Sequence, residues 1–305
     1  MKLLNYYAQH ETAAHLGAVV RGEVFDLTSI FSSDPSFRSI SVLLRSGADS
    51  LKRIQRWLDK NAGEAHASVP IDCVKYAPPV DERCRIFCVG LNYADHAAEN
   101  NLPPPESPII FGKLAAVAIG NEEPIPLPAV SQQVDYEAEV AFVIGARAKG
   151  VSVQEAWQYV AGFTIMNDVT ARDLQFQDKQ WFRGKNCDGF APLGPWLVTT
   201  DELPNPDNLA ISLSLNGQVR QKSNTSQLFF KPAELLSFLS QTLTLEAGDV
   251  ISTGTPGGIG YYADPKIFLQ HGDLVEIKVD GIGVLRNVVV REVDLKQVSP
   301  KDNRR

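Results

Sequence analysis

The sequence has little of what marks several large protein classes. Its 305 residues include four cysteines, Cys73, Cys84, Cys88 and Cys187, without a CxxC pair or zinc-finger spacing, so reduced thiols in a cytoplasmic protein are expected. There is no run of about 18 apolar residues, and therefore no membrane-spanning helix is expected. The first ten residues are too polar for the apolar core of a signal peptide. We expect a cytoplasmic protein with no membrane partner.

Positive charge is also scarce. The formal net charge is −7, and no dense Lys/Arg stretch occurs beyond Arg304-Arg305, so a nucleic-acid partner is not expected. The sequence lacks GxSxG and HExxH motifs, which argues against a serine hydrolase of the nucleophile-elbow type and against a zinc protease. The segment from Gly254 to Gly260 lacks the lysine of a P-loop and the GxGxxG spacing. These absences leave an ordinary globular composition, with 44% hydrophobic residues.

What is present is mainly short apolar segments separated by proline and glycine. Strands are predicted over residues 84–89, 209–215 and 274–279, and helices over about 50–61 and 231–241. Asn216-Gly217 predicts a hairpin turn. These elements do not alternate regularly as strand, helix, strand, which favours a sheet-rich α+β fold.

A change in pattern near residue 77 suggests two domains. Short strands with a turn at Arg21-Gly22 precede the first helix, and Ala77-Pro78-Pro79-Val80 is typical of a linker. We therefore predict a small amino-terminal α+β domain over residues 1–77 and a catalytic domain over residues 78–305.

Three acidic residues alternate within the apolar segment 134–144. Asp135, Glu137 and Glu139 recur at every second position, so on a strand they would share one face. Residues two apart on a strand lie roughly 6.6 Å apart, and like charges at this spacing repel unless a cation lies between them. A solvated strand face is the common alternative, but the pattern predicts a metal site.

A further carboxylate, Asp168, ends the predicted strand 161–168. With Glu137 and Glu139 it makes a set of oxygen ligands that suits Mg²⁺ or Mn²⁺ better than zinc. Asp135 is expected to be a structural neighbour of this set. Residues 170–173 resemble a capping box and predict the start of a helix, and Arg172 within them is expected to form a structural salt bridge.

Other polar residues qualify for catalysis or substrate binding. If residues 90–99 are helical, His96 and Glu99 share one face, and a carboxylate beside an imidazole orients it and raises its basicity. A surface ion pair is the plain alternative. Lys185 follows a glycine and is a further candidate. In the loop 249–258, glycines such as Gly254 let backbone N–H groups approach an anion, and Thr255 adds a hydroxyl.

Together these segments resemble the fumarylacetoacetate hydrolase family over about residues 82–292, and most of all its fumarylacetoacetate hydrolase domain-containing proteins. The matching segments are Val89-Gly90-Leu91-Asn92-Tyr93, Asp135-Tyr136-Glu137-Ala138-Glu139, Asn167-Asp168-Val169-Thr170-Ala171-Arg172-Asp173, Gly184-Lys185, Pro192-Leu193-Gly194-Pro195 and Thr253-Gly254-Thr255-Pro256. Each segment alone is a weak signal, whereas all of them in this order are specific for the family.

The resemblance implies roles for individual residues and properties of the whole protein. It implies metal ligands at Glu137, Glu139 and Asp168, catalytic residues at His96, Glu99 and Lys185, and substrate contacts from Gln175 and Thr255. It further implies a mixed β-sandwich roll, bound Mg²⁺ or Mn²⁺, and a homodimer. One segment departs from many relatives, because the run after Phe111-Gly112-Lys113 has no proline or serine.

The predicted activity follows from this set. We predict a metal-dependent hydrolase that cleaves a C–C bond of a 2,4-dioxo acid, of the acylpyruvate or fumarylacetoacetate type, through an enolate stabilised by the metal and Lys185. The His96–Glu99 pair would activate the water. The same electron sink would serve oxaloacetate decarboxylation or tautomerisation, or isomerisation of a 2-hydroxymuconate-type diene. A non-catalytic protein held together by its metal is less favoured, because structural calcium sites use more protein oxygens than three.

Overall fold

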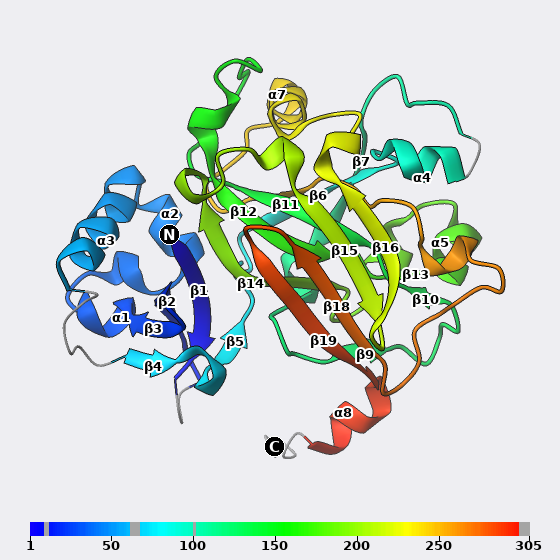
Figure 1. Ribbon diagram of the computed structural model, residues 1–305, viewed down its shortest axis with the longest axis horizontal. Helices are drawn as coiled ribbons and strands as arrows, with labels where there is room; N and C mark the ends of the chain where they lie inside the picture. Colours follow the sequence, from blue (N-terminus) through cyan, green and yellow to red (C-terminus); the bar gives the residue numbers. More distant parts are fainter. Residues whose placement is uncertain (9–11, 62–67, 100–101, 299–305) are drawn as a thin grey trace, which may run out of the picture.

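The computed structural model describes residues 1–8, 12–61, 68–99 and 102–298, and the side chains of that last range to residue 295. Strands outnumber helices in these ranges, as expected for a chain of short apolar segments (Figure 1). The helices are α1 (Leu27–Ile30), α2 (Ile40–Arg45), α3 (Ala48–Asn61), α4 (Ala94–Glu99), α5 (Arg172–Asp178), α6 (Phe182–Lys185), α7 (Pro232–Thr242) and α8 (Glu292–Val298). None of these described helices combines the length and the apolar character that a membrane span requires.

A large mixed sheet runs through the molecule. Its strand order is β4 (Ser68–Pro70), β3 (Glu23–Asp26), β2 (Ala14–Val20), β1 (Lys2–Tyr7), β14 (Ala191–Thr199), β12 (Val160–Asn167), β11 (Ala138–Ile144), β17 (Val250–Ser252), β6 (Arg85–Gly90) and β7 (Ile109–Leu114). Two shorter strands join it, β5 (Lys75–Ala77) beside β1 and β8 (Ala118–Ile119) beside β14.

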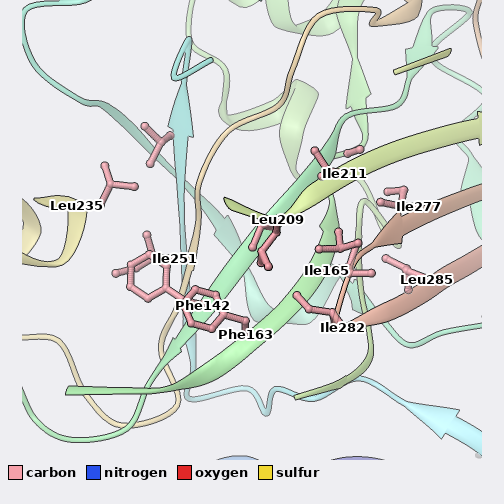
Figure 2. Packing of buried hydrophobic residues seen from close by; sticks show 14 of the residues in the cluster. Phe142, Phe163, Ile165, Leu209, Ile211, Leu235, Ile251, Ile277, Ile282 and Leu285 are labelled. Atoms are coloured by element: carbon pink, nitrogen blue, oxygen red, sulfur yellow. The ribbon is translucent and has the colours of Figure 1, made fainter. Parts of the chain in front are cut away.

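A second sheet covers one face of the first. Its order is β16 (Gln218–Asn224), β15 (Ala210–Leu215), β18 (Leu274–Val279), β19 (Gly283–Arg291) and β9 (Ile125–Leu127). Figure 2 shows Ile165 of β12 near Ile277 of β18 and Leu285 of β19, and Phe163 of β12 beside Phe142 of β11, all in one buried cluster. Burial of these apolar side chains between two sheets is the main force that holds such a sandwich together. The sheet-rich α+β fold predicted from the sequence is confirmed.

The amino-terminal strands extend the large sheet. Leu3 of β1 pairs with Leu197 of β14 in an antiparallel register, and α2 and α3 lie beside these strands (Figure 1). One buried cluster contains Leu3 and Ile54 together with Ile86 and Leu197, so apolar contacts cross the predicted linker. The division into domains at residue 77 stays a prediction.

Most predicted elements have counterparts. The helix predicted over 50–61 is α3, the helix over 231–241 is α7 with Pro232 in its first turn, and the three predicted strands are β6, β15 and β18. Asn216 and Gly217 join β15 to β16 with φ values of 52° and 76°, the conformation that a tight hairpin requires. The sequence analysis did not identify α2.

Two local predictions are wrong. The segment 134–144 is not one strand, because β10 (Val134–Asp135) pairs with β13 (Thr170–Ala171) in a separate small sheet, and Tyr136 and Glu137 lie between β10 and β11. The expected capping box is also absent from α5, since Thr170 belongs to β13 and the N-cap is Ala171 without a side-chain bond. The hydroxyl of Thr170 instead donates to the carbonyl of Asp168, which tightens the turn that follows β12.

Candidate metal centre and active site

Three buried carboxylates meet where β11 begins and the neighbouring strand β12 ends. Glu137 precedes β11, Glu139 lies within it, and Asp168 follows β12; each offers an oxygen within 4.8 Å of the others. Because Ala138 pairs with Asn167 in the antiparallel register, the ends of the two strands coincide. The amide of Asp168 donates to the carbonyl of Glu137 over 2.9 Å. The structure thus brings together all three predicted ligands.

Two cations balance Glu137. Nζ of Lys185 lies 2.8 Å from Oε2 of Glu137 and 2.7 Å from Oδ2 of Asp168. Nη2 of Arg172 donates to Oε1 of Glu137 over 2.6 Å. Burial alone would raise the pKa of Glu137, but the charges of Lys185 and Arg172 outweigh it and lower that pKa to about 2. Glu137 is therefore ionised at neutral pH.

Arg172 also anchors the two-stranded sheet formed by β10 and β13. Its Nε donates to Oδ2 of Asp135 over 2.9 Å, and Oδ1 of Asp135 accepts from the amide of Gly260 over 2.8 Å. Both side chains are buried. The structural roles predicted for Arg172 and Asp135 agree with these contacts.

Glu139 lies in a different electrostatic environment. Burial and the nearby charges of Asp168 and Glu137 hold its pKa well above its ordinary value. One oxygen, Oε2, accepts from the hydroxyl of Ser252 and from the amide of Gly254. A carboxyl group with a raised pKa beside two other carboxylates is in an excess of negative charge, which a divalent cation would relieve.

One further carboxylate oxygen of the cluster accepts no hydrogen bond from the described residues. Oδ1 of Asp168 is buried and accepts no hydrogen bond among the described residues, although Nζ of Lys113 lies 2.9 Å away. The three ammonium protons of Lys113 are accounted for by the carbonyls of Val169, Lys185 and Phe190. Lys113 thus supplies charge without a directed bond to Oδ1. A buried carboxylate oxygen of this kind, beside two others, fits a hard divalent cation.

His96 lies at the same cavity, with Glu99 beside it on α4. Nδ1 of His96 is 3.5 Å from Oε2 of Glu99 on α4, and the Glu99 carboxylate accepts from the amide of Gly258 over 3.1 Å. His96 lines a cavity of about 130 Å³ together with Glu137, Glu139 and Lys185. An imidazole beside a carboxylate and next to an acidic cluster is suited to carry a proton.

The predicted substrate-binding residues divide into two groups. Gln175 and Thr255 line the cavity; Oε1 of Gln175 accepts from Arg172 over 3.2 Å, and the Thr255 hydroxyl accepts from Gln221 over 2.8 Å. The Gly254 amide instead donates to Glu139. Gly254 has φ 98°, and a Cβ there would lie 2.9 Å from the carbonyl oxygen of Val89. Its contact supports a carboxylate of the cluster, so a role in substrate binding stays a prediction.

Sequence reasoning missed several residues of the site. Lys113 lies two positions after Phe111, but only the fold places it beside Asp168. Ser252 ends β17, a strand 113 positions away from Glu139. Phe111 and Trp181 also line the cavity, with their rings edge to face at 5.2 Å between centroids. Sequence spacing carries no signal for contacts that join such distant strands.

Comparison with known proteins places this geometry in context. The family model "Fumarylacetoacetate (FAA) hydrolase C-terminal" matches residues 85–290. Oxaloacetate tautomerase FAHD2A, mitochondrial, from Bos taurus is 42% identical over 294 residues, which cover 95% of this chain and 92% of the relative.

Solved structures agree with the fold. Fumarylacetoacetate hydrolase from psychrophilic Exiguobacterium antarcticum has a TM-score of 0.83 at 33% identity. The match covers 96% of this chain and 100% of the chain in that structure. Maleylpyruvate hydrolase from Sphingobium sp. SYK-6, in complex with manganese (II) ion and pyruvate, has a TM-score of 0.78 at 26% identity, with 95% of this chain and 99% of its own covered.

Proposed function

Given that this chain belongs to the fumarylacetoacetate hydrolase family of enzymes, we propose that it interconverts the enol and keto forms of oxaloacetate with the help of a divalent metal ion. The observation that carries this proposal is the 42% identity, over 95% of the chain, to a relative named oxaloacetate tautomerase. The family resemblance drawn from the sequence is confirmed. The oxaloacetate reaction was the alternative prediction, and it has more support than hydrolysis.

The residues present fit a metal ion with oxygen ligands. We assign Glu137, Glu139 and Asp168 as its ligands, since each is buried and contributes an oxygen to one cluster. A bound Mg²⁺ or Mn²⁺ would supply a Lewis acid that withdraws electrons from the carboxylate and keto oxygens of a 2-oxo acid. The manganese complex of maleylpyruvate hydrolase supports this type of ion without selecting between the two metals.

The charges of the cluster favour an anionic substrate. Four carboxylates and three protein cations are buried together: Asp135, Glu137, Glu139, Asp168, Lys113, Arg172 and Lys185. With all of them ionised, two further positive charges change the sum from one negative to one positive. The carboxylate at the 2-oxo acid end of the substrate would then neutralise this charge, and Lys185 would add a hydrogen-bond donor where negative charge develops on the enolate oxygen.

Proton transfer falls to the His96–Glu99 pair in this proposal. In the direction from enol to keto, the enol oxygen loses its proton, the C–O bond becomes a carbonyl, and C3 gains a proton. His96 would carry that proton, with Glu99 stabilising the imidazolium that forms in between. No water is consumed and no carbon–carbon bond breaks, which distinguishes this reaction from hydrolysis.

The size of the cavity supports a compact substrate. Its volume of about 130 Å³ is well below the roughly 300–1,000 Å³ of pockets for drug-sized ligands. Oxaloacetate is among the smallest substrates in the predicted set, whereas acylpyruvates with long acyl groups need more room.

Hydrolysis of a 2,4-dioxo acid is the second candidate. It is favoured by the similarity to maleylpyruvate hydrolase with bound pyruvate. The same His96–Glu99 pair would activate water toward the distal carbonyl, and pyruvate enolate would leave. The homodimer and the cytoplasmic location stay predictions for this chain; the Bos taurus relative is named as mitochondrial.

One experiment separates these reactions. Enol oxaloacetate is followed by ultraviolet absorbance with and without Mg²⁺ or Mn²⁺, while pyruvate is assayed in the same samples. A tautomerase accelerates loss of the enol without forming pyruvate, whereas a decarboxylase forms pyruvate from oxaloacetate. Pyruvate released from acetylpyruvate or fumarylpyruvate, with no effect on the oxaloacetate enol, would replace the tautomerase proposal by hydrolysis.

A further inference from the structure

One wall of the cavity is aromatic. Phe111 of β7 and Trp181 line this wall next to the acidic cluster. Trp181 lies one helical turn before Lys185, because the amide of Lys185 donates to its carbonyl over 3.0 Å. The ring that bounds the cavity and the lysine that balances Glu137 are thus held by the same short helix.

The position of the Trp181 ring is closely defined. A Cβ on Gly90, at the end of β6, would lie 2.8 Å from Cζ3 and 3.0 Å from Cη2 of Trp181. The ring therefore packs directly on the backbone of Gly90, where no larger residue fits without a shift. The ring also forms an edge-to-face pair with Phe111, at 5.2 Å between centroids. Aromatic pairs of this geometry are favourable beyond their buried area, so the ring is a firm boundary.

We propose that Trp181 determines specificity by limiting the length of the substrate beyond its 2-oxo acid end. This inference rests on the proposed function only in assuming that a 2-oxo acid is bound by the acidic cluster and its ion. The charged lining formed by Glu137, Glu139 and Lys185 then takes the polar end. The rest of the molecule faces Phe111 and Trp181, because Nζ of Lys185 lies 4.9 Å from the centroid of the Phe111 ring and both aromatic rings line the cavity.

The chemistry of this wall defines which substituents are rejected. An indole ring offers an apolar surface and a single donor, so it does not repel a small group but leaves no volume for an aryl or long acyl group. Replacing tryptophan by alanine removes the whole ring, and cores relax only partly after such truncations. The space that results would admit a larger substituent on the same 2-oxo acid.

The test compares binding of two acids that share one polar end. The affinity of pyruvate and of phenylpyruvate is measured by titration calorimetry in Mn²⁺ for the wild type, Trp181→Ala and Phe182→Ala. Phe182 is the matched control, since it is the next residue, is also aromatic and is 57% exposed. We expect Trp181→Ala to raise the ratio of phenylpyruvate to pyruvate affinity by about 10-fold or more, and Phe182→Ala to leave this ratio unchanged.

An unchanged ratio in folded Trp181→Ala protein would overturn the inference. If that variant does not fold, Trp181→Phe provides the test, with a smaller rise expected and an unchanged ratio again decisive. The readout is independent of turnover. If Trp181→Ala shifts the affinity ratio but the wild type has no tautomerase activity, the inference stands and the proposed function is rejected. If the wild type is an active tautomerase but the affinity ratio is unchanged in Trp181→Ala, the proposed function stands and the inference is rejected.

Discussion

Nζ of Lys185 lies 2.8 Å from Oε2 of Glu137, and both side chains are buried. The pair places an ammonium group against a carboxylate that we also propose as a metal ligand. Such an ammonium balances the excess negative charge of the cluster, but it also repels a divalent cation at close range. Its role in catalysis and its effect on metal binding therefore have opposite signs, which makes them separable by experiment.

Removal of the Lys185 charge should lower turnover without weakening metal binding. In Lys185→Met, kcat for the oxaloacetate enol should fall about 10²–10³-fold, because a donor to the developing enolate oxygen is lost. The Kd for Mn²⁺, measured by titration calorimetry, should stay the same or decrease. A variant that loses Mn²⁺ affinity while retaining kcat would show that Lys185 serves the metal site instead.

His96 is expected to act on protons alone. His96→Gln should lower kcat by about 10²–10⁴-fold, the usual contribution of a general acid or base, with no change in Mn²⁺ affinity. His15→Gln is the matched control, because His15 also pairs with a carboxylate, Asp26 at 3.0 Å, on the amino-terminal strands. Equal losses of activity in the two variants would mean that the effect comes from general destabilisation.

Arg172 is expected to dominate the stability of the site. Arg172→Met leaves the buried Asp135 and Glu137 without their shared partner, which should lower the free energy of unfolding by about 3–5 kcal/mol. Arg286→Met removes an exposed pair with Glu276 and should cost less than about 1 kcal/mol. Urea denaturation measures both variants, and similar costs would contradict the importance of the buried pair.

Gly90 should tolerate no side chain at the aromatic wall. In Gly90→Ala the new methyl group overlaps the Trp181 ring, and overpacking of this kind costs about 1–3 kcal/mol. Gly112→Ala is the control, since the nearest atom to its Cβ would be the carbonyl oxygen of Ile86 at 3.7 Å. Thermal unfolding should separate the two variants. The tryptophan fluorescence of Gly90→Ala should also change, and an unaltered spectrum with an unaltered Tm would argue against the packing described.

The sequence predicted which carboxylates come together more reliably than it predicted the backbone that carries them. Alternation selected Glu137 and Glu139 because side chains on a strand return to one face at every second residue. The chain in fact leaves the strand at Tyr136 and Glu137, since β10 pairs with β13 rather than with β12. Pairing between distant strands decides that break, and alternation alone does not contain it.

The cations that balance the carboxylate cluster were harder to predict from the sequence. Lys113 lies on β7, and its ammonium reaches the carbonyls of Val169, Lys185 and Phe190. These residues come from three segments that only the sheet order brings together. The fold class, by contrast, followed from short apolar segments and hairpin signals such as Asn216-Gly217, which are local properties of the chain.

The central proposal is that a divalent ion bound by Glu137, Glu139 and Asp168 is required for tautomerisation of oxaloacetate. The most direct test is the rate of enol loss catalysed by chelator-treated protein before and after addition of Mg²⁺ or Mn²⁺, in the wild type and in Glu139→Gln. We predict that the wild type loses activity on chelation and regains it with metal, whereas Glu139→Gln stays inactive at the same metal concentration. Undiminished activity of the chelated wild type, or of Glu139→Gln, would contradict the proposal.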